Sequence, residues 1–387
     1  MTSKPESDQP AIPMAKPWFN PGTLEAVENV LKSGWGIMGK EAQTLETTIA
    51  RRHGAHHGCS VSSATAGLHL AMLSLSAAEG HGAPCYIPSF AWPSAANMAV
   101  RSGYKPVFTD VDLKSANISP GHLLEAIKKE EKNGSCGKGD GLLVIIHEFG
   151  KPAPLDELIE IAKRHRLRVI EDAACALGTT YKGKPVGTYG ECGIFSFHPR
   201  KSITTGEGGC VITNSSDIKF SIEHLRNHGQ AIESNGSKTF VSAGFNYRIT
   251  DIQAAIGNSQ LKEFPTILQR RKELVERYIT NLAGTAGIDL PPADAGHSWQ
   301  TFMVVLDNSI NRDKVILLMG NHKIGCGPAS VAGHCLDFFK QNFGFKDDDL
   351  PNSFKLHHQG LALPLFHDLK LDQIDYICDC LKKFIAL

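Results

Sequence analysis

Short apolar runs alternate with helical patterns along the first 265 residues of the chain. One helical pattern is PLDELIEIAKRHR, in which Leu155, Leu158, Ile159 and Ala162 fall on one face and predict packing against a sheet. Apolar runs of this length, alternating with helices, predict parallel strands that are covered on both faces. The expected strands are PCYIPSF, KPVFTDVD, GLLVIIHEF, LRVIEDA, CGIFSF and GCVITN. The pattern therefore predicts an α/β fold with a mostly parallel sheet.

The predicted helices mark out three regions of the chain. TLEAVENVLKSG predicts a helix that ends at Gly34, and TAGLHLAMLSLSAA predicts a buried one. After Pro265 a long charged helix, TILQRRKELVERYITNL, leads to shorter patterns and to a final amphipathic helix. We expect a flexible N-terminus over residues 1–16, a large domain over 17–265 and a smaller α+β domain over 266–387. The N-terminus is expected to become ordered only by docking on another part of the protein.

Composition narrows the class of protein. The 387 residues include 40 Lys and Arg and 40 Asp and Glu, so no overall charge attracts nucleic acid or a membrane surface. The chain starts without an apolar leader and contains no apolar run long enough to span a bilayer, which predicts a cytoplasmic protein. The 10 cysteines form no CxxC pair, which predicts reduced thiols and no metal site.

Polar residues follow several of the expected strands, and ligands of such sheets bind where the strands end. Asp172 ends one strand, while Lys201, with His198 and Ser196 before it, follows another. Trp92 follows a third strand, and SSATAG places small hydroxyl residues where a buried helix starts, which suits an anion. Each feature has a plain structural alternative. These are a pairing of Asp172 with arginine, a solvated lysine, a core tryptophan and a simple helix cap.

Taken together, these features match the needs of one cofactor, pyridoxal 5′-phosphate (PLP). PLP requires a Schiff-base lysine, an acid that faces its ring nitrogen and a cup for its phosphate. Lys201 and Asp172 supply the first two, because one turn and one further strand between them place both at neighbouring strand ends. A lysine forms the imine as the free amine, a form that burial and nearby positive charge promote.

An ordered series of motifs from Gly34 to Leu261 resembles one family, the DegT/StrS-like sugar aminotransferases of PLP fold type I. The motifs are SGWGIMGKEAQTLE, SSATAGLHLAM, PSFAWPSA, KPVFTDVD, VIEDAACALG, FSFHPRKSITTGEGG, RNHGQ and GFNYRITDIQAAIGNSQL. The resemblance implies that Lys201 carries the cofactor, that Asp172 faces the ring nitrogen and that Trp92 stacks on the ring. It also implies that the phosphate is bound by Ala64, Thr65 and Ser196 and by Asn246 of the partner subunit in a homodimer with composite active sites.

Two departures from the family pattern concern the cofactor and the substrate. Cys175 stands where the family has His or Gln, the residue that hydrogen-bonds the O3′ atom of the ring. The segment GCGPASVAGHCLDFF lacks the family's His/Tyr-Pro pattern near the substrate. The identity of the substrate therefore cannot be copied from other members.

The sequence predicts a transaminase that moves an amino group from an amino acid, glutamate in the first place, to a nucleotide-linked keto-sugar. A PLP-dependent sugar dehydratase is the alternative within the fold, but that branch has histidine at the position of Lys201. A PLP-binding regulator without catalysis is the alternative outside enzymes. Arg248 is a candidate for a donor carboxylate or a substrate phosphate, with a structural ion pair as the alternative. His228 either lines the cleft or ends a helix.

Overall fold

The computed structural model describes residues 10–76, 82–132, 141–233 and 235–387. Its largest sheet has seven strands in the order β1-β9-β8-β5-β4-β2-β3. The strands from β8 to β3 are parallel, whereas β9 is antiparallel to both of its neighbours. The sheet is mostly parallel, as predicted, and its strands are β1 His57–Val61, β2 Pro84–Pro88, β3 Lys105–Thr109, β4 Leu142–Ile146, β5 Arg168–Asp172, β8 Cys192–Ser196 and β9 Gly209–Thr213.

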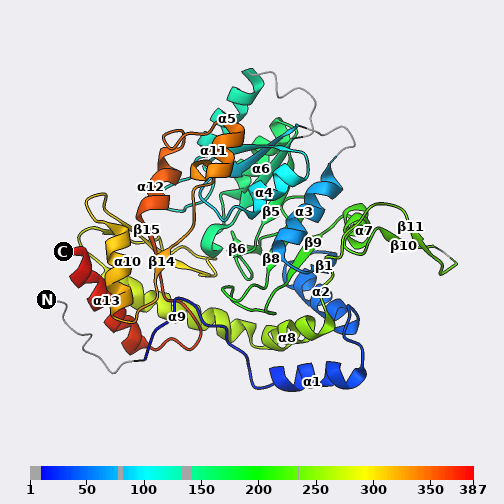
Figure 1. The fold of residues 1–387 in the computed structure, drawn as a ribbon, viewed down its shortest axis with the longest axis horizontal. Coiled ribbons are helices and arrows are strands. Elements are labelled where there is room, and N and C mark those ends of the chain that lie inside the picture. The colour runs from blue at the N-terminus through cyan, green and yellow to red at the C-terminus, as the bar shows by residue number, and fades with distance from the viewer. Residues whose placement is uncertain (1–9, 77–81, 133–140, 234) are drawn as a thin grey trace.

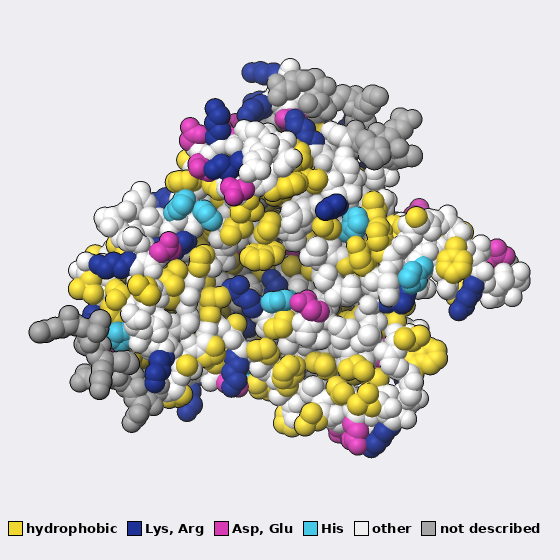
Figure 2. Space-filling model, in the orientation of Figure 1, with side chains coloured by type: hydrophobic (Ala, Val, Ile, Leu, Met, Phe, Trp, Pro, Cys, Tyr) yellow, Lys and Arg dark blue, Asp and Glu magenta, His cyan; other side chains and the backbone are white. Residues whose placement is uncertain are grey.

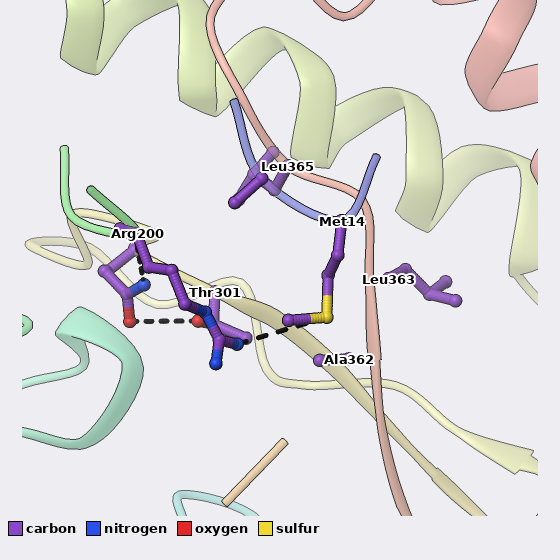
Figure 3. A pocket seen from close by; sticks show the side chains of 8 residues that line it. Met14, Arg200, Thr301, Ala362, Leu363 and Leu365 are labelled. Atoms are coloured by element: carbon purple, nitrogen blue, oxygen red, sulfur yellow. Dashed lines mark hydrogen bonds between the residues drawn. The ribbon is translucent and has the colours of Figure 1, made fainter. Parts of the chain in front are cut away.

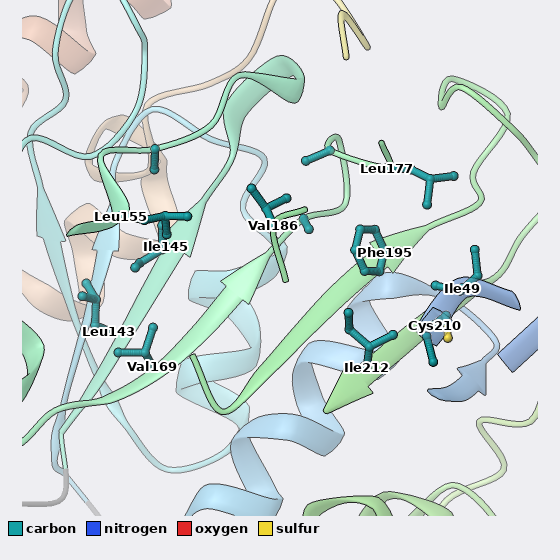
Figure 4. Packing of buried hydrophobic residues seen from close by; sticks show 14 of the residues in the cluster. Ile49, Leu143, Ile145, Leu155, Val169, Leu177, Val186, Phe195, Cys210 and Ile212 are labelled. Carbon is teal, nitrogen blue, oxygen red and sulfur yellow. The ribbon is translucent and has the colours of Figure 1, made fainter. Parts of the chain in front are cut away.

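Helices cover both faces of this sheet (Figure 1). Successive residues of β4 belong to different cores, since Leu143 and Ile145 face one side and Leu142 and Val144 the other. Figure 4 shows part of the first core, where Ile145 packs near Leu155. The first face is covered by α2 Lys40–Arg52, α5 Pro120–Lys132, α6 Leu155–Arg164 and α8 Asp251–Lys262, and the second by α3 Ala64–Leu75, α4 Ser94–Arg101 and α7 Ser216–Leu225.

Local signals in the sequence explain where several helices begin and end. Helix α1 (Thr23–Ser33) ends at Gly34, whose φ of 70° lies in the left-handed region that glycine adopts without strain. Helix α3 begins after Ser63, whose hydroxyl accepts a hydrogen bond from the Ala66 N–H. These boundaries agree with the sequence-based expectation.

The C-terminal part is built on a second sheet of four strands, all of whose neighbours pair antiparallel. The long helix α9 (Phe264–Leu282) and the last helix α13 (Leu371–Ile385) share one core with this sheet. The combination of an antiparallel sheet with helices is the predicted α+β arrangement, while the boundary at residue 265 stays a prediction. The other elements here are β12 Ile288–Asp289, β13 Phe302–Leu306, α10 Arg312–Asn321, β14 Gly327–Pro328, η2 Gly333–Cys335, α11 Asp337–Phe343, α12 Pro351–Gln359 and β15 Gly360–Leu363.

The described part of the N-terminal segment docks on the C-terminal sheet. Ile12 is 2% exposed, and its N–H and C=O bond to Lys323 and Gly325. Met14 Sδ accepts a hydrogen bond from Arg200 Nη2 at 4.0 Å. Both residues line a small cavity together with Thr301 and Leu365 (Figure 3). The N-terminal segment therefore contacts the loop that carries Lys201.

The structure also departs from the sequence-based expectations. Strand β1 was not expected, because its residues HGCSV include only two apolar side chains, Cys59 and Val61. The polar, Gly-rich sequence KKEEKNGSCGKGDG, residues 128–141, predicts a surface loop. Helix α5 instead extends to Lys132, and residues 133–140 lie outside the described ranges. Two short hairpins were also not expected, and they comprise β6 Thr180–Tyr181 with β7 Lys184–Pro185 and β10 Gln230–Ile232 with β11 Lys238–Phe240. Across the described ranges, no helix combines the length and apolar character needed to cross a membrane.

Candidate active site

The ends of several strands meet at one edge of the large sheet. Asp172, the last residue of β5, lies opposite Ile146 of β4 and Ile194 of β8. Ser196, the last residue of β8, lies opposite Gly209, the first residue of β9. This edge is where an α/β sheet binds its ligands.

Lys201 lies in the loop between β8 and β9, at this edge of the sheet. Its Nζ donates a hydrogen bond to Cys175 Sγ at 3.0 Å. Burial lowers the pKa of the Lys201 amine, but Cys175, Asp172 and Glu148 outweigh burial and raise the pKa above its ordinary value. The expected neighbouring positive charge does not dominate here, because the groups nearest to the amine are acids.

Asp172 is 5% exposed, and its Oδ1 accepts a hydrogen bond from the Ala174 N–H at 3.0 Å. Burial raises the pKa of the Asp172 carboxyl, against the lowering effects of Ala174 and Lys201. The adjacent Glu171 has a different role. Its carboxylate accepts hydrogen bonds from the Gly187 N–H and from the Tyr189 and Gly190 N–H groups, and it pairs with His147 Nε2 at 3.1 Å. Successive residues of a strand face opposite sides, so of these two neighbouring acids Asp172 is the one that acts on the lysine.

The start of helix α3 lies at the same edge, and its N–H groups suit an anion. The N–H groups of Ala64 and Thr65 belong to the first turn, which has no acceptors within the helix. Gly209 packs so closely that a Cβ there would lie 2.7 Å from the Ala64 nitrogen. Because Gly209 pairs with Ser196, the register brings Ala64, Thr65 and Ser196 to one corner.

Trp92 follows β2 at the same edge, two strands from β5, and is 68% exposed. Most of the Trp92 side chain is therefore accessible to solvent, and Trp92 is not a core residue. Its contact with a cofactor ring stays a prediction.

His228, Asn246 and Arg248 form a separate group at the base of the β10–β11 hairpin. Asn246 is exposed and pairs through its backbone with Asn227, whose side-chain oxygen accepts a hydrogen bond from Arg248 Nη1 at 2.7 Å. His228 is exposed, with a left-handed φ of 61°, and its N–H donates to Phe245 O. This group is linked to the start of α3 through Tyr247, whose C=O accepts a hydrogen bond from the Ser62 N–H at 2.8 Å.

Sequence reasoning missed one residue of this site, Glu148. It is 6% exposed and begins the short helix η1 (Glu148–Gly150), just after β4. Its charge acts on both Lys201 and Asp172. The signal was present as an acid at the end of an apolar run, but GLLVIIHEF was interpreted wholly as a strand.

The residues at this edge suit PLP. A lysine amine, a carboxyl group that is almost fully buried and a helix start whose N–H groups lack intrahelical acceptors match the aldehyde, the ring nitrogen and the phosphate of PLP. The close approach of Gly209 leaves no room for a side chain between β9 and the helix start. The described residues contain no cluster of three or more His, Cys, Asp or Glu side chains that could hold a metal ion.

Comparisons with known proteins agree with this assignment. Residues 20–382 match the DegT/DnrJ/EryC1/StrS aminotransferase family. The UDP-4-amino-4-deoxy-L-arabinose–oxoglutarate aminotransferase of Shewanella sediminis is 32% identical, over 97% of this chain and 98% of that protein.

Solved structures share the fold. The aminotransferase PseC of Helicobacter pylori, involved in the biosynthesis of pseudaminic acid, superposes with a TM-score of 0.90 at 24% identity, over 97% of this chain and 100% of that chain. A Streptococcus pneumoniae protein solved in its PLP form has a TM-score of 0.88 at 23% identity, over 97% of this chain and 99% of that chain. The chain belongs to the DegT/DnrJ/EryC1/StrS aminotransferase family and is a PLP-dependent aminotransferase of fold type I.

Proposed function

We propose that this protein transfers the amino group of glutamate to the ketone of a nucleotide-linked sugar. The observation that carries the proposal is the meeting of Lys201 and Asp172 beside an anion site at one edge of the sheet. The name of the Shewanella sediminis relative, which pairs a UDP-linked amino sugar with oxoglutarate, supports the choice of both substrates.

The roles of the residues follow from their chemistry. Bound PLP supplies an electron sink for the charge that develops on a substrate carbon. Lys201 Nζ would attach the cofactor and afterwards carry the proton between substrate and cofactor atoms as general base and acid. The Asp172 carboxylate would keep the ring nitrogen protonated, and Ala64, Thr65 and Ser196 would bind the phosphate. Trp92 would stack on the ring, and Arg248 and His228 remain candidates for substrate contacts.

The test follows the visible chromophore of the purified protein. Glutamate should bleach it and release 2-oxoglutarate, and a UDP-linked keto-sugar should restore it, whereas Lys201→Ala should show neither change. Failure of glutamate and of every other amino acid tested to bleach the chromophore would favour the regulator instead. Loss of water from the sugar without release of 2-oxoglutarate would favour the dehydratase.

We further propose that the protein acts as a cytoplasmic homodimer with composite sites. Large apolar side chains lie exposed on and after α1, where Leu24 is 83% and Trp35 56% exposed, and on the β10–β11 hairpin, where Phe240 is 67% exposed. Figure 2 shows hydrophobic side chains gathered along the lower edge, where α1 lies in Figure 1. Asn246 lies at the base of that hairpin and would reach the phosphate of the other subunit.

Mixed dimers test this arrangement. Asn246→Asp would place a carboxylate against the phosphate, and Lys201→Ala removes the amine, so each variant alone should be inactive. In a mixed dimer one site has both defects and the other has none. After statistical reassembly, about one quarter of all sites should work. If mixed dimers form without any recovery of activity, Asn246 does not act across the interface.

A further inference from the structure

Glu148 is a second buried carboxyl group beside Lys201, and the proposed reaction leaves it without a role. Lys201 Nζ donates a hydrogen bond to Cys175 Sγ at 3.0 Å, and the charges of two carboxyl groups, Asp172 and Glu148, act on the same amine. A single ammonium can balance only one carboxylate in a buried space, so the second carboxyl group is driven to keep its proton.

The backbone around Glu148 is held from several directions. Its N–H donates a hydrogen bond to Asn117 Oδ1 at 2.8 Å, and the next residue, Phe149, has a left-handed φ of 57°. Gly150 lies so close to the neighbouring turn that a Cβ there would be 2.9 Å from the carbonyl oxygen of Cys175. The turn that carries Glu148 is therefore packed against the turn that carries the thiol partner of Lys201.

The carboxyl group of Glu148 joins the lysine to the C-terminal part of the chain. It interacts with Lys201 and Asp172 and hydrogen-bonds Ser330, which is 6% exposed. The segment after Ser330 pairs with the segment after β2, because the Ala91 N–H donates to Val331 O at 3.0 Å. Glu148 thus interacts both with Lys201 and with the C-terminal segment that contacts the residues after β2.

Two histidines also lie near this pair. His147 acts on Asp172 from the residue before Glu148, and His198 lies near Lys201 on the loop after β8. Burial raises the pKa of Glu148 to about 8, while Lys201 and Ser330 lower it and Asp172 raises it.

We propose that Glu148 is a positioning residue that holds a proton beside Lys201 and, when it loses that proton, keeps the Lys201 nitrogen protonated. The inference rests on the proposed role of Lys201 as the amine that binds the cofactor. Glu148 is neutral at pH 7 and negative above its titration. In the alkaline range its charge therefore opposes release of the proton from Lys201 Nζ.

The experiment measures how fast Lys201 reacts with acetic anhydride in the full chain after the cofactor has been removed. Mass spectrometry of the Lys201 peptide gives the rate at pH 7 and at pH 9.5. At pH 7 Glu148→Gln should react at the rate of the wild type, because Glu148 is neutral there. At pH 9.5 the variant should react about tenfold faster, the size of effect that one nearby opposite charge has on a protonation equilibrium.

Two further variants complete the design. Ser330→Ala removes a hydrogen bond that favours ionised Glu148, so less of Glu148 is ionised near pH 8.5. Lys201 in this variant should therefore be acetylated faster than in the wild type at that pH, but more slowly than in Glu148→Gln. This variant tests the inference even if Glu148→Gln does not fold. Glu160→Gln removes an exposed acid that pairs with Arg164 on α6 and should change nothing.

A ratio of variant to wild-type rates that is the same at both pH values overturns the inference, because a merely structural change would act equally at both. The cofactor-free measurement also separates the two proposals. A pH-dependent ratio in a protein that fails to transaminate supports the role of Glu148 and refutes the proposed function alone.

Discussion

Gly209→Ala tests whether the close contact between β9 and the start of α3 builds the phosphate site. The added Cβ would lie 2.7 Å from the Ala64 nitrogen and 2.8 Å from both the Ser63 carbonyl carbon and the Phe195 oxygen. All three are backbone atoms, and unstrained contacts of carbon atoms lie near 3.5 Å or above. The start of the helix must therefore move away from β9.

The size of the effect follows from this displacement. Overpacking of this kind costs about 1–3 kcal/mol of folding stability. A hydrogen bond to a charged group is worth about 1.5–3 kcal/mol, so losing one phosphate contact should weaken binding about 10- to 100-fold. The loss should be confined to ligands that carry the phosphate.

Pyridoxamine phosphate is the suitable probe, because it cannot form an imine with Lys201 and so reports the non-covalent site. Calorimetry should give weaker binding of pyridoxamine phosphate to Gly209→Ala, with little change for pyridoxamine, and the cofactor-free variant should melt at a lower temperature. Gly320→Ala is the matched control, because its Cβ would meet nothing within 4 Å. It should bind normally and be more stable by about 0.4–1 kcal/mol. If Gly209→Ala melts like the wild type and binds pyridoxamine phosphate within twofold of it, the contact does not shape the site.

Three other substitutions test individual side chains. Asp172→Asn keeps the shape of the carboxyl group without its charge, so the rate of transamination should fall far more than cofactor occupancy measured by absorbance; equal losses would indicate a structural acid. Cys175→Ala should retain most of its turnover because a thiol is a weak hydrogen-bond donor, and a loss beyond about tenfold, 1.4 kcal/mol, would contradict this. Since the folded-state pKa of Glu148 is raised to about 8, its contribution to stability is present at acidic pH and is lost as the pH rises toward 8. Urea unfolding of the cofactor-free chain should therefore show the wild type losing stability relative to Glu148→Gln between pH 5 and 8, by up to about 1.4 kcal/mol per pH unit, and parallel profiles would refute the shift.

Local patterns in the sequence were sufficient to predict most strands of the large sheet, and the ordered motifs were sufficient to identify the family. The apolar runs became β2, β3, β4, β5, β8 and β9, and Gly34 ended its helix, because side-chain periodicity and backbone freedom act over a few residues. The sequence also predicted that Asp172 ends a strand and that Lys201 follows the next long strand.

Only the tertiary structure decided the direction of β9 and the surroundings of the lysine. An apolar run of five residues does not reveal in which direction its strand will run within a sheet. In the folded chain β9 pairs with both β8 and β1, and both pairings are antiparallel. The acidic environment of Lys201 likewise depends on distant segments, since Glu148 is held by Asn117 and by the packing of its turn against Cys175. Such contacts join residues far apart in the chain, and no local pattern encodes the distance between a buried acid and an amine.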